Sequence, residues 1–172
     1  MFLNYLKDFF TLKLVKKNLA SVRLPAAEHK IKTIGILFDE TYFTEKDALI
    51  QGLVSAGIAA QAIQILVFKN SIKKNETFDY PVFSHRDLSW RATFDNSQVK
   101  SFMAQRFDLL INYYDMPKSA LLVVSNQSKA LFKVGFSTID KKLNHFMINT
   151  TAENYSVFLA ELVKYLKILN KL

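Results

Sequence analysis

FDLLINYY, residues 107–114, is a largely apolar run between two segments with helical periodicity. Such a run is typical of a strand that is buried on both faces, and strands of this kind occur in parallel sheets covered by helices. The run therefore predicts an α/β fold. Its polar end, residues 112–115, would then lie at the edge of the sheet where ligands of such folds bind.

The composition favours a single domain without a membrane span. The chain has 172 residues, of which 50% are hydrophobic, and its 15 Phe and 7 Tyr can fill one large core. No segment approaches the roughly 20 apolar residues that cross a bilayer. Lys7 and Asp8 interrupt the apolar start before a signal peptide could form. The absence of cysteine excludes disulfides and thiolate metal sites, and we expect a cytoplasmic protein.

Positive charge is concentrated near the start of the chain. The net charge is +8, and residues 1–34 hold seven basic and two acidic residues, which is +5 of that total. This asymmetry predicts a basic N-terminal appendage on a nearly neutral body. We place the appendage and its linker around Pro25 at residues 1–29, and a single α/β domain at residues 30–172.

The appendage has the pattern of an amphipathic helix over residues 2–19. Its apolar residues recur at spacings of three and four, and they are Phe2, Leu3, Leu6, Phe9 and Phe10. Packing on the body, on a second copy or on another protein is the favoured role, because this stripe is too large to stay exposed. Attachment to an anionic membrane, at its inner face, comes second. Nucleic acid is the least favoured partner.

The body alternates strands with helices. This order predicts a three-layer sandwich around a mostly parallel sheet, of flavodoxin-like or Rossmann-like type, with the N-terminal helix as an extension. We expect three helices to be capped at their N-termini, by Thr44, by Asp95 or Ser97, and by Thr150 with Glu153. Gly57 is the expected C-terminal end of the first of these helices. The expected strands are residues 31–38, 63–68, 81–84, 107–114, 131–136 and 146–148.

The motifs of the common α/β enzymes are absent. The four glycines form neither a dinucleotide fingerprint nor a P-loop, so nucleotide binding through those motifs is excluded. The three histidines lie far apart in sequence, and no serine has the setting of a hydrolase nucleophile. The sequence therefore predicts no metal, no cofactor and no assigned catalytic residue.

The densest polar segment is the loop at residues 84–90, SHRDLSW. His85, Arg86 and Asp87 at a strand exit could hold a small anionic or sugar-like ligand, with Trp90 as an apolar wall. Alternatively, the segment is a capped turn in which Ser84 or Asp87 satisfies main-chain amides. The capped turn is the favoured interpretation.

Two further strand exits carry candidate ligand-binding residues. Asn112, Tyr113 and Asp115 could bind a ligand by stacking and hydrogen bonding, although a helix cap at Asp115 and a packed tyrosine explain them more simply. Asp39 and Glu40 form a carboxylate pair that could bind a cation or act as a general base. Without a third ligand, a solvated loop is the favoured interpretation.

The predicted lysine-rich N-terminal helix is followed by the segments FSHRDLSW (83–90), FDLLINYY (107–114) and FKVGF (132–136). In these features the chain resembles a family of small uncharacterised bacterial α/β proteins. The resemblance spans nearly the whole chain, but each motif is short and mostly hydrophobic. It implies an α/β fold and an intracellular bacterial setting. It brings no activity and no catalytic residues, and it adds interest to Asp87 and Trp90.

Two kinds of function remain open from the sequence. The favoured one is a non-enzymatic binding or interaction module that the basic helix recruits to a partner, a second copy or a membrane surface. The other is an enzyme that acts on a small polar metabolite or glycosyl donor at the strand exits, through His85, Arg86 and Asp87. A closed pocket around these three residues would favour the enzyme.

Overall fold

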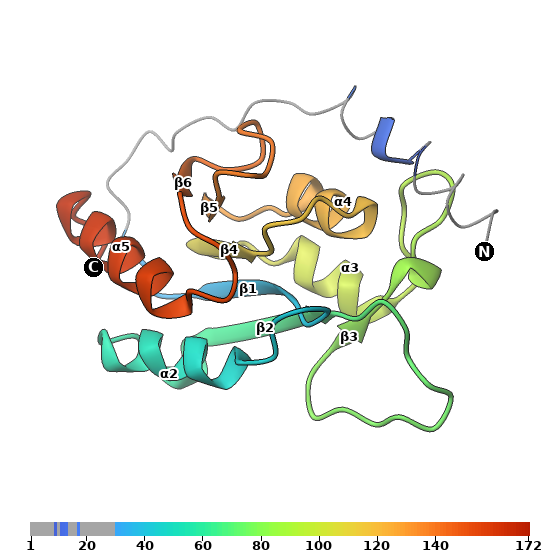
Figure 1. The fold of residues 1–172 in the computed structure, drawn as a ribbon, viewed down its shortest axis with the longest axis horizontal. Helices are drawn as coiled ribbons and strands as arrows, with labels where there is room; N and C mark the ends of the chain where they lie inside the picture. Colours follow the sequence, from blue (N-terminus) through green and yellow to red (C-terminus); the bar gives the residue numbers. More distant parts are fainter. Residues whose placement is uncertain (1–8, 10, 14–16, 18–29) are drawn as a thin grey trace.

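A six-stranded sheet, parallel throughout, forms the centre of the molecule (Figure 1). The computed structural model describes Phe9, residues 11–13, Lys17 and residues 30–172. The strands are β1 (Ile34–Asp39), β2 (Ile63–Phe68), β3 (Val82–Phe83), β4 (Leu109–Tyr113), β5 (Phe132–Phe136) and β6 (Phe146–Ile148). The α/β fold predicted from the sequence is thereby confirmed.

The strands lie in the order β3-β2-β1-β4-β5-β6, so the chain winds outward from β1 in one direction and then from β4 in the other. This is the strand order of the Rossmann type, which separates the two fold types that the sequence left open. The order reverses between β1 and β4. Ligands of such sheets bind at that reversal, beyond the carboxyl ends of the strands.

Helices cover both faces of the sheet. Helices α2 (Lys46–Ser55) and α5 (Tyr155–Ile168) pack against each other on one face, and α3 (Ser97–Ala104) and α4 (Ser119–Gln127) on the other (Figure 1). At Gly52 of α2, a Cβ atom would approach Cδ1 of Leu159 to 2.2 Å, so a larger residue there would force the Leu159 side chain to move. Two short 3-10 helices complete the body, η1 (Ala60–Ala62) and η2 (His85–Asp87).

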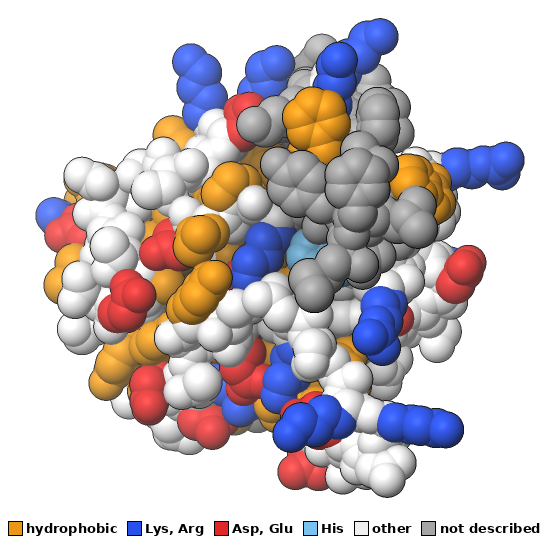
Figure 2. Space-filling view, turned by 45° about the vertical axis from the view of Figure 1, so that its right-hand side comes forward, with side chains coloured by type: hydrophobic (Ala, Val, Ile, Leu, Met, Phe, Trp, Pro, Cys, Tyr) orange, Lys and Arg blue, Asp and Glu red, His pale blue; other side chains and the backbone are white. Residues whose placement is uncertain are grey.

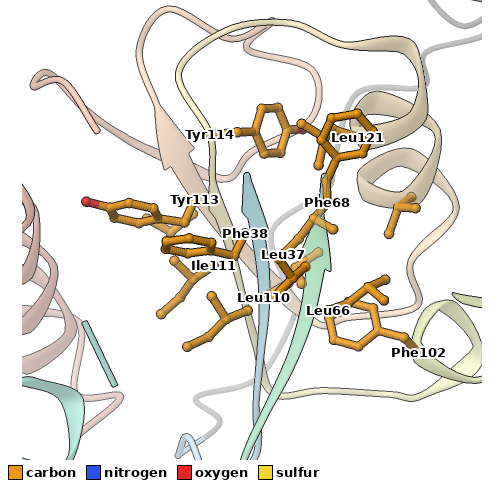
Figure 3. Close-up of a cluster of buried hydrophobic side chains, with 14 of the residues drawn as sticks. Leu37, Phe38, Leu66, Phe68, Phe102, Leu110, Ile111, Tyr113, Tyr114 and Leu121 are labelled. Carbon is orange, nitrogen blue, oxygen red and sulfur yellow. The ribbon is translucent and has the colours of Figure 1, made fainter. Parts of the chain in front are cut away.

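The 107–114 run forms the central strand β4, as predicted. All five residues of β4 are buried, and it pairs with β1 on one side and β5 on the other. Tyr113 and Tyr114 point to opposite faces of the sheet (Figure 3). Tyr113 stacks on Phe38 with ring centroids 5.4 Å apart, whereas Tyr114 lies near Leu121 of α4.

Helix termini differ from the prediction more than strands do. Asn96, not Asp95 or Ser97, caps α3, by accepting hydrogen bonds from the N–H groups of Gln98 and Val99. Helix α2 starts after Glu45 rather than Thr44, and α5 starts after Asn154 rather than Thr150, both without a side-chain cap. Gly57 has a φ of +100° directly after α2, which confirms it as a helix end.

Most of the predicted N-terminal helix, residues 2–19, and the linker up to residue 29 lie outside the described residues. Of the described ones, Thr11 is 1% exposed and Leu12 packs against the core of the body, whereas Phe9 is 54% exposed. The domain division at residue 30 stays a prediction. In the described parts of the chain, no helix is both long enough and apolar enough to span a bilayer.

Candidate functional site

The loops that follow β1 and β4 meet at the reversal of strand order. The β1 loop carries Asp39, Glu40 and Thr41, and the β4 loop runs through Asp115 to Lys118, which directly precedes α4. Because both strands end at the same edge of the sheet, residues 79 positions apart in sequence become neighbours. We call the surface formed by these two loops the carboxyl edge.

Lys118 connects the two sides of the carboxyl edge. Its ammonium group donates to Oδ2 of Asp39 at 2.5 Å and to Oγ1 of Thr41 at 2.7 Å. Asp39 also accepts hydrogen bonds from the N–H and the hydroxyl of Thr41, which fix its carboxylate in place. The Lys118 and Asp39 side chains are both largely buried, so this ion pair is only weakly screened by solvent.

Aromatic rings flank the Lys118 ammonium. Nζ lies 4.9 Å from the centroid of the Phe68 ring and 5.3 Å from that of the Tyr42 ring. Tyr42 is 66% exposed, and Met116 in the β4 loop is also exposed. An ammonium has three N–H donors, and Asp39 and Thr41 use two of them. Among the hydrogen bonds of the described residues, the third N–H has no acceptor.

The second carboxylate, Glu40, is neutralised separately. It forms ion pairs with Lys46 of α2 at 3.3 Å and with Lys69 at 3.2 Å, and it accepts a hydrogen bond from the hydroxyl of Tyr80. Although partial burial of the ammonium acts in the opposite direction, hydrogen bonds to Glu40 and Tyr80 raise the pKa of Lys46. Lys69 also pairs with Glu76. The carboxyl edge is therefore polar but balanced in charge.

The loop at residues 84–90 forms a capping box. Oδ2 of Asp87 accepts from the N–H of Ser84 at 2.8 Å and from its hydroxyl at 3.1 Å, while Oδ1 accepts from Asn96 at 3.2 Å. Both oxygens of Asp87 are thus engaged in local structure. Arg86 is exposed, and the ring of His85 meets the Phe68 ring edge-on at 4.8 Å. Trp90 is 56% exposed, in a turn after the box.

His85 therefore lies on the same Phe68 ring as Lys118, which brings the loop to the border of the carboxyl edge. The structure does not bring His85, Arg86 and Asp87 together around one of the hollows described for residues 30–172, which are lined by other residues. Their role in ligand binding stays a prediction.

The other predicted binding residues, Asn112, Tyr113 and Asp115, are occupied by contacts within the protein. The Tyr113 hydroxyl donates to the Ala152 carbonyl at 2.6 Å, and desolvation raises its pKa. Oδ2 of Asp115 accepts from the Ala152 N–H at 2.9 Å, so Asp115 anchors the start of the α5 region and does not cap α4. Asn112 is fully buried.

Asn112 belongs to a buried polar cluster that the sequence analysis missed. The Ser125 hydroxyl donates to Oδ1 of Asn112, and therefore accepts from the Tyr114 hydroxyl at 2.6 Å. Nδ2 of Asn112 donates to Oδ1 of Asn144. The ammonium of Lys133, on β5, donates to the Ser125 carbonyl at 2.7 Å. Burial lowers the pKa of Lys133 to about 8.

This cluster lies inside the protein, whereas the carboxyl edge reaches the surface at Tyr42 and Met116. Lys133 is 5% exposed, and burial raises the pKa of Tyr114, so the tyrosine keeps its proton. A lysine in the middle of the apolar run FKVGF was the sequence signal that could have revealed the cluster. Nδ2 of Asn144 has no partner among the described residues, but the other groups of the cluster are engaged with one another, which indicates a role in holding β4, β5 and α4 together.

The described residues contain no group of three or more His, Cys, Asp or Glu side chains that could hold a metal ion. The Asp39 and Glu40 carboxylates have lysine partners instead. The carboxyl edge can thus offer a lysine N–H, an exposed tyrosine ring and neutral polar groups. These features suit hydrogen bonding and stacking with a ligand of low charge.

Comparison with known proteins gives a family and no individual relative. Neither the curated proteins nor the solved structures contain a match to the chain. A family model matches residues 7–169, which is nearly the whole sequence. The chain therefore belongs to DUF6913, a family of unknown function.

Proposed function

We propose that this protein is a non-enzymatic binding module that holds a small polar ligand at the carboxyl edge. The observation that supports this most strongly is the state of its two carboxylates. Asp39 is held by Lys118, and Glu40 by Lys46 and Lys69, so both are tied up in ion pairs. A general base needs a carboxylate within reach of a substrate proton. These carboxylates orient lysines instead.

The ligand that fits this surface carries an oxygen acceptor and a flat or apolar face. The oxygen accepts the third N–H of Lys118, and the face rests on the exposed ring of Tyr42. A strongly anionic ligand would meet Asp39 and Glu40 at short range, and a strongly cationic one would meet three lysines. An uncharged or weakly charged ligand is therefore favoured.

Equilibrium dialysis against a mixture of small polar metabolites, with mass spectrometry of both sides, tests this proposal. We expect at least one compound to be retained by the wild type and recovered unchanged. Tyr42→Ala should weaken its retention at least tenfold, because it removes the stacking face without disturbing the core. Val157→Ala, at an exposed position on α5, is the control and should retain the compound.

An enzyme acting on a small polar metabolite or glycosyl donor is the second candidate. It is supported by His85, which touches the same Phe68 ring as Lys118 and so borders the carboxyl edge. In this case the dialysis mixture would contain a new product, and His85→Ala would abolish its formation. Product formation by the wild type would reject the binding-only proposal.

The N-terminal segment adds a recruitment function to the proposal. A bacterial, cytoplasmic protein with a basic N-terminal helix could be brought by that helix to a protein partner, to a second copy or to the inner face of the membrane. The burial of Thr11 and the packing of Leu12 on the core support packing on the body. Nucleic acid is less favoured, because acidic side chains lie among the basic ones in the lower half of the face in Figure 2. Removal of residues 1–29 followed by vesicle co-sedimentation and analytical ultracentrifugation separates these roles.

A further inference from the structure

Strand β2 has an open edge. It pairs with β1 along its whole length, but with β3 only through Val67 and Phe68. On the β3 side, the Val67 N–H donates to the Pro81 carbonyl at 3.0 Å. Main-chain groups of a strand point alternately to its two neighbours. The N–H and C=O of Ile65 therefore point in the same direction as those of Val67, to the place where β3 has not yet begun.

Pro81 explains why the pairing stops there. If the parallel pairing of β2 and β3 continued toward the start of β3, the next hydrogen bond would join the N–H of residue 81 to the Ile65 carbonyl. Residue 81 is proline, which has no N–H. Within residues 30–172, the two main-chain groups of Ile65 have no partner across this edge. The protein thus presents a neighbouring donor and acceptor at a position that its own chain cannot fill.

A hollow of about 370 Å³ lies at this edge. Besides Ile65 and Pro81, its walls include Tyr80 and the α3 residues Gln98, Ser101 and Phe102. The Tyr80 ring is fixed, since its hydroxyl donates to Glu40 and the Lys46 ammonium lies 4.5 Å from its centroid. The volume is within the range of small-molecule sites, which combine apolar walls with a few polar groups.

The charge of the hollow restricts the ligand further. Asp79 is its acidic residue, and no Lys, Arg or His lines it. A phosphorylated ligand would find no basic partner there and would face the Asp79 carboxylate. An uncharged ligand avoids this repulsion.

We infer that the hollow beside Ile65 is a second binding site, for an uncharged planar heteroaromatic molecule with a hydrogen-bond donor next to an acceptor, as in a nucleobase. The donor of the ligand meets the Ile65 carbonyl, its acceptor meets the Ile65 N–H, and its ring lies against Tyr80 and Phe102. The site is built from a strand edge and α3, and it is independent of the ligand proposed for the carboxyl edge.

Titration of the ¹⁵N-labelled full chain with adenine, followed by amide NMR, tests this inference. Adenine carries an amino donor beside a ring nitrogen acceptor, whereas 9-methylpurine has neither the amino group nor the N9–H and so offers acceptors only. We expect adenine to shift the Ile65 amide signal in a saturable manner, with 9-methylpurine binding at least tenfold more weakly. AMP should bind no more tightly than adenine, because its phosphate has no basic partner.

Matched variants separate this site from general surface binding. Ser101→Trp places a large ring in the hollow and should weaken adenine binding at least tenfold, whereas Lys100→Trp, one position along the same helix but outside the hollow, should leave it unchanged. Pro81→Ala restores an N–H that can occupy the Ile65 carbonyl, and it should weaken binding several-fold.

Each of the following results would overturn the inference. Adenine leaves the Ile65 signal unshifted, the Ser101→Trp and Lys100→Trp variants bind adenine equally, or AMP binds more tightly than adenine. Binding of a short extended peptide without binding of adenine would also reject it, because the edge would then serve as a strand-pairing site.

Discussion

The protein places lysines in two contrasting environments. At the carboxyl edge, Lys118 and Lys46 face the carboxylates of Asp39 and Glu40. Inside the sheet, the ammonium of Lys133 donates to the carbonyl of Ser125 and has no carboxylate partner among the described residues. The edge lysines thus lie beside opposite charges, whereas burial of the Lys133 ammonium lowers its pKa, so its charged form is held at the expense of stability. This contrast indicates that the edge is organised for contact with polar molecules and the interior cluster for fixing β5 against α4.

The largest expected effect comes from Lys133. Its pKa of about 8 lies below the ordinary lysine value of 10.5, so the folded state releases this proton at a lower pH than the unfolded state does. The free energy of unfolding should therefore rise between pH 8 and pH 10.5, by about 3 kcal/mol from this group. Lys133→Met should abolish the rise and stabilise the protein at pH 7. Denaturant unfolding at pH 7 and pH 9.5 measures both effects.

Lys129→Met is the control for that experiment, because Lys129 is exposed near the end of the same α4–β5 connection. It should retain the pH dependence of the wild type. If Lys133→Met also retained that dependence, Lys133 would not titrate as the structure indicates.

The next effect concerns the ion pair at the carboxyl edge. Asp39→Ala leaves the largely buried Lys118 ammonium without its carboxylate and should lower the free energy of unfolding by about 2 kcal/mol. The loss of unfolding free energy in the double variant Asp39→Ala with Lys118→Met should be smaller than the sum of the losses in the two single variants, because no unpaired charge remains. A double-mutant cycle by denaturant unfolding measures the coupling, and additive effects would show that the two groups do not interact.

A smaller effect is expected at the capping box. Asp87→Ala removes the acceptor for the Ser84 N–H and for Asn96, and should cost about 1 kcal/mol. Ligand retention in the dialysis experiment should not change, because Asp87 serves the local turn. A loss of retention without a loss of stability would instead assign Asp87 to the binding site, as the enzyme hypothesis requires.

The smallest effect is expected at Lys69, which is only partly buried. Lys69→Met should cost about 0.5 kcal/mol at low salt and less in 1 M NaCl, because ion pairs near the surface are screened. Burial acts to lower the pKa of Lys69, but hydrogen bonds to Glu76 and Glu40 raise it overall. Its contribution should therefore be complete below pH 10.5 and disappear above it, opposite in sign to that of Lys133. Thermal unfolding at two salt concentrations checks the prediction.

The strands could be predicted from the sequence because their signal is local. The apolar runs at residues 63–68 and 146–148 correspond to β2 and β6 without a shift of either end. Helix starts depend on contacts elsewhere in the fold. Asp115, expected near the cap of α4, instead accepts the N–H of Ala152, 37 residues away.

The candidate site could be predicted only in part, for the same physical reason. The search at strand exits found Asp39 and Glu40, whose position follows from the end of β1. Lys118, the partner of Asp39, was missed, because it reaches Asp39 only through the pairing of β1 with β4, and the sequence does not specify strand order. The open edge at Ile65 depends in the same way on where β3 begins.

Amide chemical-shift mapping with the ligand retained in dialysis tests the central claim most directly. If the protein binds its ligand at the carboxyl edge, the largest shifts will fall at residues 39–42 and 115–119, and Tyr42→Ala will remove them. A hollow between α2 and α5, lined among others by Gln51 and Tyr155, and the edge at Ile65 are the alternative places. The claim would be contradicted if the largest shifts fell at either of them, with the carboxyl edge unchanged.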